Sequence, residues 1–451
     1  MTKKQQSYAV TNPATGEVER RYALASDEQI ATTLDHADHA YRTWGKTSTK
    51  HERARLLSQV ADIYASNTES LANIITHEMG KSHEEAVGEV GFTADIYRYY
   101  ADHGVALLDD EPVARVSGGT ATMRKSPIGV LLGIQPWNYP YYQVTRFAAP
   151  NLMLGNTIIL KHAELCPQSA AAMEQIFSQA GFPEGAYTNV YASFEQVRTI
   201  IADPRVRGVS LTGSERAGKD IAQQAGSHLK KVVCELGGND PFIVLSTDNM
   251  DAAVEAGAAA RFENCGQICN GAKRFIIVDA LYDEFLSKFK AFASKLKLAP
   301  LCSVQAAERL SGQVHAALDA GATLDMGSAD NHGAFFPACV LTDIPQGAAA
   351  RHEEFFGPVA QFYRVSSEEE AIALANDTPY GLGSYLFTTD AKQAARVAAQ
   401  IDAGMVYINE SGADSAEMPF GGVKNSGFGR EMGTPGIREF VNLKLISTHQ
   451  E

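Results

Sequence analysis

The feature that most constrains the fold is a regular alternation of short apolar runs with helix-length segments from Pro127 onward. The apolar runs are Ile128–Ile134, Thr157–Leu160, Ala186–Tyr191, Gly208–Thr212 and Lys231–Leu236. Segments of helix length, such as Pro167–Ala180 and Ser214–Ala225, lie between the later runs. Strands separated by helices form parallel βαβ units whose helices cover both faces of the sheet. The sequence therefore predicts an α/β fold.

A second α/β stretch follows residue 238, where we predict the main domain boundary. Its strand candidates are Pro241–Leu245, Arg274–Val278 and Tyr385–Phe387. A chain of 451 residues is too long for one ordinary core, which favours two or three domains. Val113–Met123 and Phe440–Thr448 alternate as strands do and flank the main units. We expect these two segments to pair as an appended sheet that reaches a partner subunit.

Composition and charge exclude several classes of protein. The net charge of −14 argues against a nucleic-acid or anionic-membrane partner, since either favours a basic face. No apolar stretch follows the first lysines and no run of 18 apolar residues occurs, so neither a secretory signal nor a membrane span is expected. Six cysteines in so long a chain do not make a disulfide scaffold, and reduced thiols in a cytoplasmic enzyme are expected.

One of those cysteines, Cys269 in Asn264-Cys-Gly-Gln-Ile-Cys-Asn270, has surroundings that suit a nucleophile. A thiolate attacks an aldehyde carbon, and the resulting thiohemiacetal can release a hydride to leave a thioester. Gly266 suits a loop or helix start, where backbone N–H groups favour the thiolate. Taken alone, a cysteine is more often a small buried hydrophobe. A zinc site with Cys265 is disfavoured, because no second ligand pair has the right spacing.

Two polar residues at strand ends have chemistry that complements such a thiol. Glu235, in Cys234-Glu-Leu-Gly-Gly238, closes an apolar run, where burial can raise a carboxyl pKa to suit a base for thioester hydrolysis. Asn138, in Gln135-Pro-Trp-Asn-Tyr-Pro140, can donate its amide N–H to an oxyanion together with the Cys269 backbone N–H. Standing alone, the first is equally a solvated glutamate and the second a turn asparagine.

A phosphate-binding turn is expected after the strand Gly208–Thr212. The segment Gly213-Ser-Glu-Arg-Ala-Gly218 opens a helix, whose N-terminus can receive a pyrophosphate. Neither the dinucleotide fingerprint GxGxxG nor the P-loop GxxxxGK[ST] is present, since Lys219 is followed by Asp220. By itself this motif is a weak signal.

Together these stretches resemble the aldehyde dehydrogenase superfamily, from Thr11-Asn-Pro-Ala-Thr-Gly16 to Phe420-Gly-Gly-Val-Lys-Asn-Ser-Gly-Phe-Gly-Arg430. The resemblance implies two parallel-sheet α/β domains, a Rossmann-type cofactor domain and a catalytic domain, plus a small β oligomerisation arm. The implied division is 1–112 and 127–237 for the cofactor domain, 238–412 for the catalytic domain, and 113–126 and 431–451 for the arm, with 413–430 returning to the active-site mouth. A homodimer or homotetramer also follows from the resemblance.

The resemblance further implies a role for each matching residue. Cys269 is similar to the family's nucleophile, Glu235 to its general base and Asn138 to its oxyanion-hole amide. Lys161 is similar to the lysine at the adenosine ribose, Ser214 to the residue at the pyrophosphate, and Glu354 and Phe356 to the pair at the nicotinamide ribose and ring. The expected cofactor-binding residues are Trp137, Lys161, Glu164, Gly213, Ser214, Gly218, Glu354 and Phe356, and no metal is expected.

Within the superfamily the chain is most similar to bacterial succinate-semialdehyde dehydrogenases. The similarity rests on Lys161-His-Ala, on Arg146 eight residues after Asn138, and on Ser415 in Asp414-Ser-Ala-Glu-Met-Pro-Phe420. An arginine and a serine at these positions would hold a distal carboxylate, for which the planar guanidinium is suited. Two departures stand out: Glu263 replaces a second arginine, for which Arg261 is a candidate substitute, and the segment Lys295–Pro300 is about a dozen residues shorter than usual.

The cofactor is expected to be NAD in preference to NADP. Glu164, three residues after Lys161, can accept hydrogen bonds from both ribose hydroxyls and would repel a 2′-phosphate. One alternative is the same chemistry on another aliphatic, aromatic or phosphorylated aldehyde. A non-catalytic binding protein on the same fold predicts loss of the nucleophile or base, and both are present. A redox bridge between Cys265 and Cys269 would require their Cα atoms to lie within about 7 Å.

Overall fold

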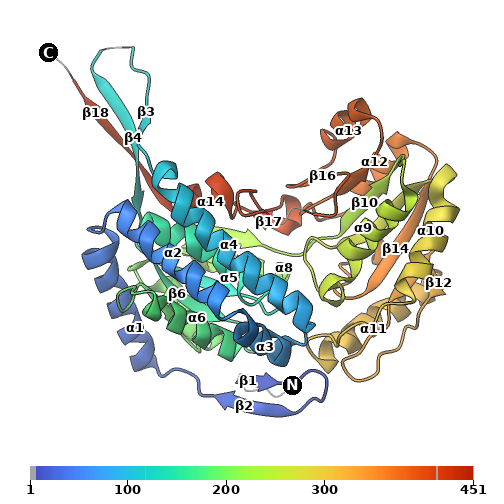
Figure 1. The fold of residues 1–451 in the computed structure, drawn as a ribbon, viewed down its shortest axis with the longest axis horizontal. Coiled ribbons are helices and arrows are strands. Elements are labelled where there is room, and N and C mark those ends of the chain that lie inside the picture. Colours follow the sequence, from blue (N-terminus) through green and yellow to red (C-terminus); the bar gives the residue numbers. More distant parts are fainter. Residues whose placement is uncertain (1–6, 117, 413–414, 450–451) are drawn as a thin grey trace.

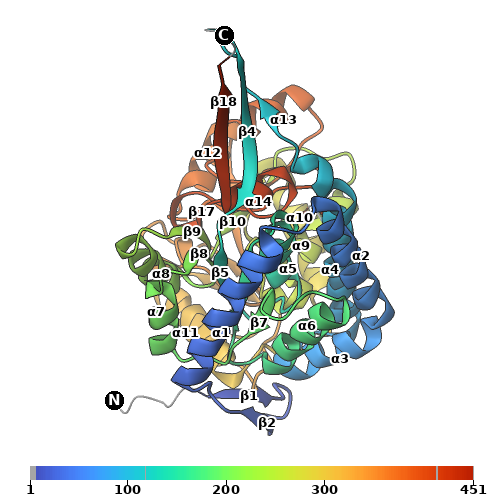
Figure 2. The same cartoon turned by 90° about the vertical axis from the view of Figure 1, so that its left-hand side faces the viewer.

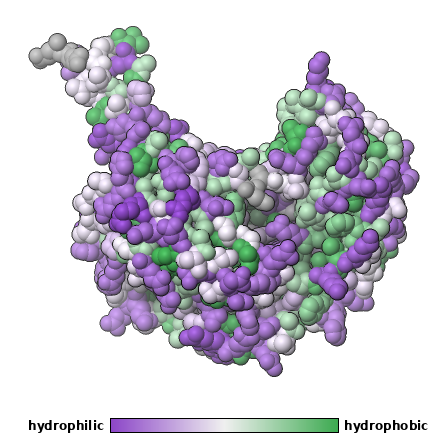
Figure 3. Space-filling view, in the orientation of Figure 1, coloured by the Kyte–Doolittle hydropathy of each residue, from purple (hydrophilic) through white to green (hydrophobic). Residues whose placement is uncertain are grey.

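The computed structural model describes residues 7–116, 118–412 and 415–449. Two α/β units stand side by side, and a thin β arm projects from one of them (Figure 1). In the space-filling view the upper edge is hollowed between the arm and the second unit (Figure 3). Among the described residues, none of the helices combines the length and apolar character needed to cross a bilayer.

The first unit is built on a six-stranded sheet of order β17-β9-β8-β5-β6-β7. Its strands are β5 (Val130–Gln135), β6 (Thr157–His162), β7 (Tyr187–Asn189), β8 (Val206–Thr212), β9 (Lys231–Glu235) and β17 (Gly427–Phe428). The helices that connect them are α5 (Tyr142–Leu154), α6 (Pro167–Gln179), α7 (Phe194–Ala202) and α8 (Glu215–Ser227). Strands β5 to β9 run parallel, as predicted. Only β17 is antiparallel, and it pairs with β9 beside Glu235.

Helices from the first hundred residues cover this sheet, as Figure 1 shows. They are α1 (Asp27–Ala40), the π-helical turn η1 (Tyr41–Gly45), α2 (Lys50–Ser66), α3 (Thr68–Met79) and α4 (His83–Leu107), preceded by the hairpin of β1 (Tyr8–Thr11) and β2 (Val18–Tyr22). Tyr64 and Tyr97 stack in the core between α2 and α4 with ring centroids 5.6 Å apart. Helix packing of this kind buries the apolar stripe that each helix carries.

The second unit contains a seven-stranded sheet of order β12-β13-β14-β11-β10-β15-β16. Its strands are β10 (Asp240–Val244), β11 (Ala272–Val278), β12 (Thr323–Met326), β13 (Cys339–Thr342), β14 (Val359–Val365), β15 (Tyr385–Phe387) and β16 (Tyr407–Ile408). The helical segments are α9 (Met250–Phe262), η2 (Glu263–Gly266), α10 (Asp279–Ala293), α11 (Val304–Asp319), η3 (Ala349–Arg351), α12 (Glu368–Asn376) and α13 (Ala391–Ala398), and η4 (Lys424–Ser426) and α14 (Gly433–Glu439) follow toward the C-terminus. The sheet is parallel except for β12, which pairs antiparallel with β13.

The arm is formed by β4 (Thr120–Pro127) and β18 (Val441–Thr448), with the short β3 (Glu111–Pro112) on the other edge of β4 (Figure 2). All eight residues of β18 pair antiparallel with β4, which confirms the predicted pairing. The predicted strand Val113–Met123 is wrong in its first part, because the strand starts at Thr120. Gly118 and Gly119 have φ of 74° and 81°, a left-handed conformation that interrupts extended structure.

The strand order of the first sheet determines where a ligand can bind. Strands β6 and β8 lie on opposite sides of β5, so the connections diverge between β5 and β8. Ligands of open α/β sheets bind at the carboxyl ends of the strands at such a switch point. The turn after β5 carries Asn138, and the turn after β8 carries Ser214. Both predicted motifs therefore lie at the edge of the sheet where a dinucleotide would bind.

Candidate active site

The turn that carries Cys269 begins with an unusual backbone. Asn264, Cys265 and Gly266 have φ of 47°, 54° and 73°, three consecutive residues in the left-handed region. For non-glycine residues this conformation costs about 1–2 kcal/mol each. At Gly266 a Cβ atom would lie 2.4 Å from the Gly357 carbonyl oxygen, so only glycine fits. Cys269 follows in a turn before β11, and so lies in a loop and not at a helix start.

Hydrogen bonds from buried side chains hold this turn in place. Arg261 donates to the carbonyl oxygens of Gly266, at 2.6 Å, and Ala272, at 3.1 Å. Asn264 Nδ2 donates to the Asn138 carbonyl at 2.8 Å. The guanidinium of Arg261 is buried and bonds to backbone, so it does not replace the missing substrate arginine. Its position makes it part of the support for the nucleophile.

The shortened segment after α10 also supports the turn. Cys265 Sγ donates to the Ala299 carbonyl at 3.0 Å, and the Cys302 backbone N–H donates to Gln267 Oε1 at 2.9 Å. The Cys265 thiol is buried, and burial raises its pKa to about 12. Cys265 therefore serves as a packing and hydrogen-bonding group in this structure.

The half-buried Cys269 lies on the wall of a cavity of about 630 Å³, called here the Cys269 cavity. Burial raises the pKa of the Cys269 thiol to about 11, against the lowering effect of Arg146 and Lys273. The aromatic residues of the cavity are Phe92, Tyr139, Tyr142, Tyr385 and Phe420, and its charged residues are Glu85, Glu89, Asp95, Arg146 and Glu263. This cavity has room for a small aldehyde beside the thiol.

Asn138 is buried, and two hydrogen bonds fix the orientation of its amide. Its Nδ2 donates to the Gln267 carbonyl at 2.9 Å, and its Oδ1 accepts from Gln143 Nε2 at 2.9 Å. The N–H₂ end therefore points toward the turn of Cys269, two residues from the nucleophile. This is the orientation that an oxyanion donor needs.

Glu235 ends β9 in a buried position, where neither carboxylate oxygen has a hydrogen-bond partner among the described residues. Burial, and then the nearby Glu431, raise the pKa of Glu235 well above its usual range, while Arg146 and Arg430 oppose this. A Cβ atom at Gly421 would lie 2.7 Å from Glu235 Oε1, so a glycine makes room for the carboxyl. A carboxyl with these properties suits general-base chemistry near neutral pH.

Arg146 lies on the Cys269 cavity but is bound by a buried carboxylate. Its Nε donates to Glu431 Oε2 at 2.9 Å, and its guanidinium carbon lies 4.0 Å from the centre of the Phe420 ring. Its Nη2 atom is buried and has no hydrogen-bond partner among the described residues. The predicted substrate residue Ser415 does not line the cavity, although Ser411 and Gly412, a few residues earlier in the chain, do. The Ser415 hydroxyl instead forms a hydrogen bond with Glu417.

Glu263 lies on the same cavity and accepts a hydrogen bond from the Tyr139 hydroxyl at 2.8 Å. Two other acidic groups of the wall bind backbone. Glu85 accepts from the Asn264 N–H at 2.6 Å, and Glu89 accepts from the Tyr141 N–H at 2.8 Å. Asp95 and Glu263 are exposed, so they are the acidic groups that an incoming substrate would meet.

A second cleft, of about 560 Å³, contains Ser214, Gly237, Glu354 and Tyr380 and is called here the Ser214 cleft. Ser214 caps α8 by accepting from the Ala217 N–H. Glu354 Oε1 accepts from the Gly238 N–H at 3.1 Å. A Cβ atom at Gly237 would lie 2.4 Å from Glu354 Oε2, so the double glycine lets the glutamate approach.

The remaining predicted cofactor residues lie at the ends of neighbouring elements. Lys161, which is buried at the end of β6, forms an ion pair of 2.6 Å with Glu164. Trp137 and Phe356 contact edge to face, with ring centroids 5.7 Å apart. The Gly213 N–H donates to the Glu235 carbonyl at 2.9 Å, and Gly218 allows α8 to pack on Leu236. A helix N-terminus, a lysine and a glutamate at a switch point are groups that fit a dinucleotide.

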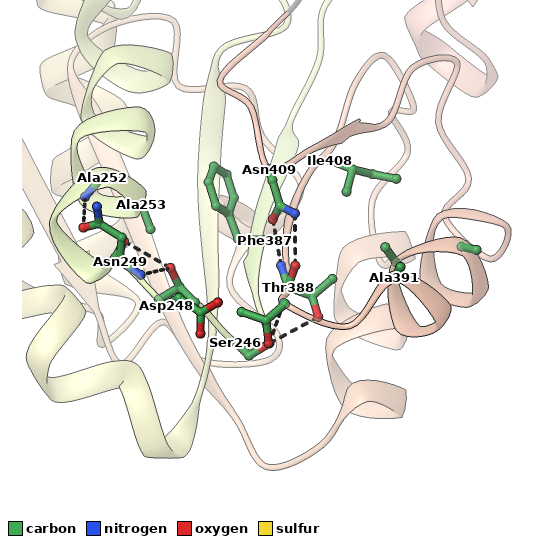
Figure 4. A pocket seen from close by; sticks show the side chains of 14 residues that line it. Ser246, Asp248, Asn249, Ala252, Ala253, Phe387, Thr388, Ala391, Ile408 and Asn409 are labelled. Carbon is green, nitrogen blue, oxygen red and sulfur yellow. Dashed lines mark hydrogen bonds between the residues drawn. The ribbon is translucent and has the colours of Figure 1, made fainter.

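Another cavity of about 630 Å³ lies in the second unit, between α9, β15, α13 and β16 (Figure 4). Its polar groups bond mainly to one another. Asn409 bonds to both the N–H and the carbonyl of Thr388, and Ser246 bonds to the hydroxyls of Thr388 and Thr389. None of the predicted site residues lines this cavity. In the described part of the chain no group of three or more His, Cys, Asp or Glu side chains could hold a metal ion.

Several supporting residues were not predicted from the sequence. Gln267, Lys273 and Glu431 bond to Asn138, Cys269 and Arg146 respectively, and the first two of these bonds involve backbone carbonyls. Such contacts leave no pattern in residue types. The one available signal was the short distance along the chain between Cys269 and Lys273.

Comparison with known proteins identifies relatives over the whole length. The profile of the Aldehyde dehydrogenase family matches residues 1–446. A protein of Deinococcus radiodurans named as an NADP(+) succinate-semialdehyde dehydrogenase is 49% identical and is matched over 97% of this chain and 94% of its own length. The structure of a succinic semialdehyde dehydrogenase of Streptococcus pyogenes with NADP+ has a TM-score of 0.95 at 41% identity, over 97% of this chain and 99% of its own. A salicylaldehyde dehydrogenase of Pseudomonas putida G7, solved with salicylaldehyde, has a TM-score of 0.94 at 32% identity, over 99% and 96% of the chains.

Proposed function

The chain belongs to the aldehyde dehydrogenase family, and within it we propose that the substrate is succinate semialdehyde, oxidised to succinate. The chain is an oxidoreductase that acts on an aldehyde group with a nicotinamide dinucleotide as acceptor. One observation carries the choice of substrate: the buried Arg146, whose Nη2 has no hydrogen-bond partner among the described residues, lines the cavity that contains Cys269. A guanidinium nitrogen in that position can bind the distal carboxylate of the aldehyde. The names of the most similar relatives support this choice.

We assign the steps of the reaction to three residues. The Cys269 thiolate attacks the aldehyde carbon, and the oxyanion of the thiohemiacetal accepts hydrogen bonds from Asn138 Nδ2 and the Cys269 N–H. A nicotinamide dinucleotide held by the residues assigned to the cofactor would supply the hydride acceptor, and loss of the hydride from that carbon would leave a thioester on Cys269. Glu235 then removes a proton from water, the hydroxide adds to the thioester, and the acid leaves as the thiol is restored.

Within this scheme the first sheet and its covering helices, residues 1–112 and 127–237, bind the cofactor, and residues 238–412 carry the nucleophile. Lys161 would hold the adenosine ribose and Ser214 the pyrophosphate. Glu354 and Phe356, together with Trp137, would hold the nicotinamide end. These residues fit a dinucleotide because the Ser214 cleft lies at the switch point of the sheet and because Glu354 lies beside the turn that follows Glu235.

Substitutions at Cys269 and Glu235 test the assignment of these steps. Cys269→Ala should abolish the formation of reduced cofactor, because no other group forms the thiohemiacetal. Glu235→Gln should release about one equivalent of reduced cofactor per site in a rapid burst and then turn over at least about 100-fold more slowly, in line with the loss of a general base. Stopped-flow absorbance at 340 nm separates the burst from the steady state.

Because Glu235 must be ionised to accept the proton, thioester hydrolysis should speed up as pH rises through its raised pKa. In Glu235→Gln the residual steady-state rate should no longer rise with pH over this range. A Glu235→Gln enzyme with the wild-type steady-state rate would remove Glu235 from the base role, and a Cys269→Ala enzyme that still turns over would remove the nucleophile.

The role of Arg146 is tested by a substitution that keeps its charge beside Glu431. Arg146→Lys retains the ion pair but removes the planar group that carries Nη2. We expect kcat/KM for succinate semialdehyde to fall about 10-fold or more, equivalent to about 1.4 kcal/mol of lost binding. Butanal, which has the same length and no carboxylate, is the matched control and should change little. Another aldehyde would be favoured as substrate if Arg146→Lys lowered kcat/KM equally for both aldehydes. The same would follow if the wild-type enzyme oxidised butanal or salicylaldehyde faster than succinate semialdehyde.

The choice of dinucleotide is the second specificity question. The names of the relatives include NADP(+), so they do not support the preference for NAD expected from the sequence. We nevertheless propose that Glu164 disfavours a 2′-phosphate, because its carboxylate lies 2.6 Å from Lys161, the lysine assigned to the ribose. The adjacent ammonium compensates part of that charge, which limits the size of the effect.

The wild-type enzyme should therefore have a higher kcat/KM with NAD than with NADP, and Glu164→Ser should reduce the ratio about 10-fold. Glu284→Ser, which removes an exposed carboxylate from α10, is the control and should leave the ratio unchanged. A wild-type preference for NADP would contradict the proposed role of Glu164.

We propose that the arm joins copies of the chain. Leu443 and Leu445 are exposed on one face of β18, and the outer edge of this eight-residue strand is unpaired within the described chain. An exposed apolar edge strand favours association. Leu445→Lys should shift the protein from dimer or tetramer toward monomer in size-exclusion chromatography with light scattering, whereas Asn442→Lys on the other face should not. A monomeric wild-type protein would refute this role for the arm.

A further inference from the structure

Lys273 is a buried charged residue that the proposed chemistry does not use. It lies near the start of β11, four residues after Cys269, and its side chain is fully buried. Its ammonium group contacts three acceptors: the carbonyl oxygen of Ile268 at 2.9 Å, the carbonyl oxygen of Cys269, and Glu354 Oε1 at 3.2 Å. Two of its N–H donors thus bond to backbone carbonyls, and the Glu354 carboxylate forms an ion pair with the ammonium group.

The cost of burying an ammonium group makes these contacts informative. A lysine removed from water loses several kcal/mol of hydration unless acceptors and a counter-charge replace the water. Here the acceptors are the two carbonyls that define the nucleophile turn, and the counter-charge is Glu354. This carboxylate comes from a separate segment of the chain and not from the strands on either side of Lys273. The contacts therefore link two parts of the site that are about 80 residues apart in the chain.

We propose that Lys273 is a positioning residue that ties the backbone of the nucleophile to Glu354, and so sets the nicotinamide end of the cofactor relative to Cys269. The inference rests on the proposed function only in assigning Glu354 to the nicotinamide ribose. Gly238 holds the same Glu354 oxygen through its N–H at 3.1 Å, so the carboxylate is fixed between the turn after Glu235 and the turn of Cys269. One ammonium group thereby joins the base-bearing and nucleophile-bearing turns.

The charge of Lys273 has a second effect, on the thiol itself. Together with Arg146 it favours the thiolate of Cys269, against burial and the carboxylates of Glu354 and Asp240. Loss of the ammonium should therefore slow alkylation of Cys269 in the free enzyme. This effect needs neither aldehyde nor cofactor, so it provides a measurement that is independent of turnover.

The experiment is a double-mutant cycle between Lys273→Met and Glu354→Gln. Methionine has a similar length but no charge or donor. We expect each single substitution to raise the Kd for NAD, measured by fluorescence titration, about 10-fold, and the double variant to be no weaker than the worse single one. Lys230→Met is the matched control, because Lys230 also donates to two backbone carbonyls, those of Asp203 and Val206, away from the site. It should leave the Kd unchanged.

The second measurement is the rate at which iodoacetamide alkylates Cys269, followed by mass spectrometry of its peptide across pH 7 to 10. At pH 8 we expect Lys273→Met to react about 10-fold more slowly, the change that one pKa unit produces. Lys273→Arg keeps the positive charge and should restore most of the reactivity. If Lys273→Met does not fold, as judged by its circular dichroism, Lys273→Gln, which is polar and uncharged, replaces it in the cycle with Glu354→Gln.

Additive effects on the Kd, or an alkylation profile equal to that of the wild type, would overturn the inference and leave Lys273 as a core residue. An unchanged Kd in Glu354→Gln would also overturn it. In each case normal oxidation of succinate semialdehyde would leave the proposed function standing. If the Kd values show the expected coupling between Lys273 and Glu354 but the wild-type enzyme does not oxidise succinate semialdehyde, the result would instead count against the proposed substrate.

Discussion

The site depends on a turn of three left-handed residues, Asn264 to Gly266, from which the nucleophile follows. Such a backbone is unfavourable for the two non-glycine residues, so the surrounding structure must stabilise it. Arg261 provides part of this by donating to carbonyls on either side of Cys269. The oxyanion amide Asn138 is joined to the same turn, because its own carbonyl and its N–H₂ both bond there. Thiol and oxyanion donor are therefore positioned by one hydrogen-bonded unit.

Compensation of buried charge is the second organising principle of the site. Arg146 pairs with Glu431, and Lys273 pairs with Glu354, in places where an uncompensated charge would be costly. Glu235 differs from these groups, since neither of its carboxyl oxygens has a hydrogen-bond partner among the described residues. Burial, and then the nearby Glu431, raise its pKa. Under the proposed function this unpaired carboxyl takes a proton from water, whereas the paired charges hold the geometry.

The Cys269 cavity combines one arginine with several carboxylates. Two of the acidic groups in its wall are occupied by backbone N–H donors, and Glu263 accepts a hydrogen bond from Tyr139. Arg146 lies deeper, with one nitrogen free of hydrogen-bond partners in the described structure. An aldehyde that carries a distal carboxylate would pass exposed carboxylates before it reaches this nitrogen. Under the proposed function, the contact with Arg146 would offset the electrostatic cost at the entrance.

The sequence alone determined the α/β class and most strands of the first sheet, whereas it predicted only three strands of the second, those now seen as β10, β11 and β15. It also supplied the proposed nucleophile, base and amide. Hydrophobic runs and turn residues are local signals, and the motifs around Cys269, Glu235 and Asn138 are contiguous in the chain. Only the tertiary structure revealed the partners of those groups, such as Glu431 for Arg146 and Glu354 for Lys273. These contacts join segments that are distant in sequence and depend on how two sheets face each other, so no local pattern encodes them. The same reason explains why the sequence could offer Arg261 only as a candidate substrate ligand: its type is visible in the sequence, but the direction of its side chain is decided by packing, which turns it to the backbone of the Cys269 turn.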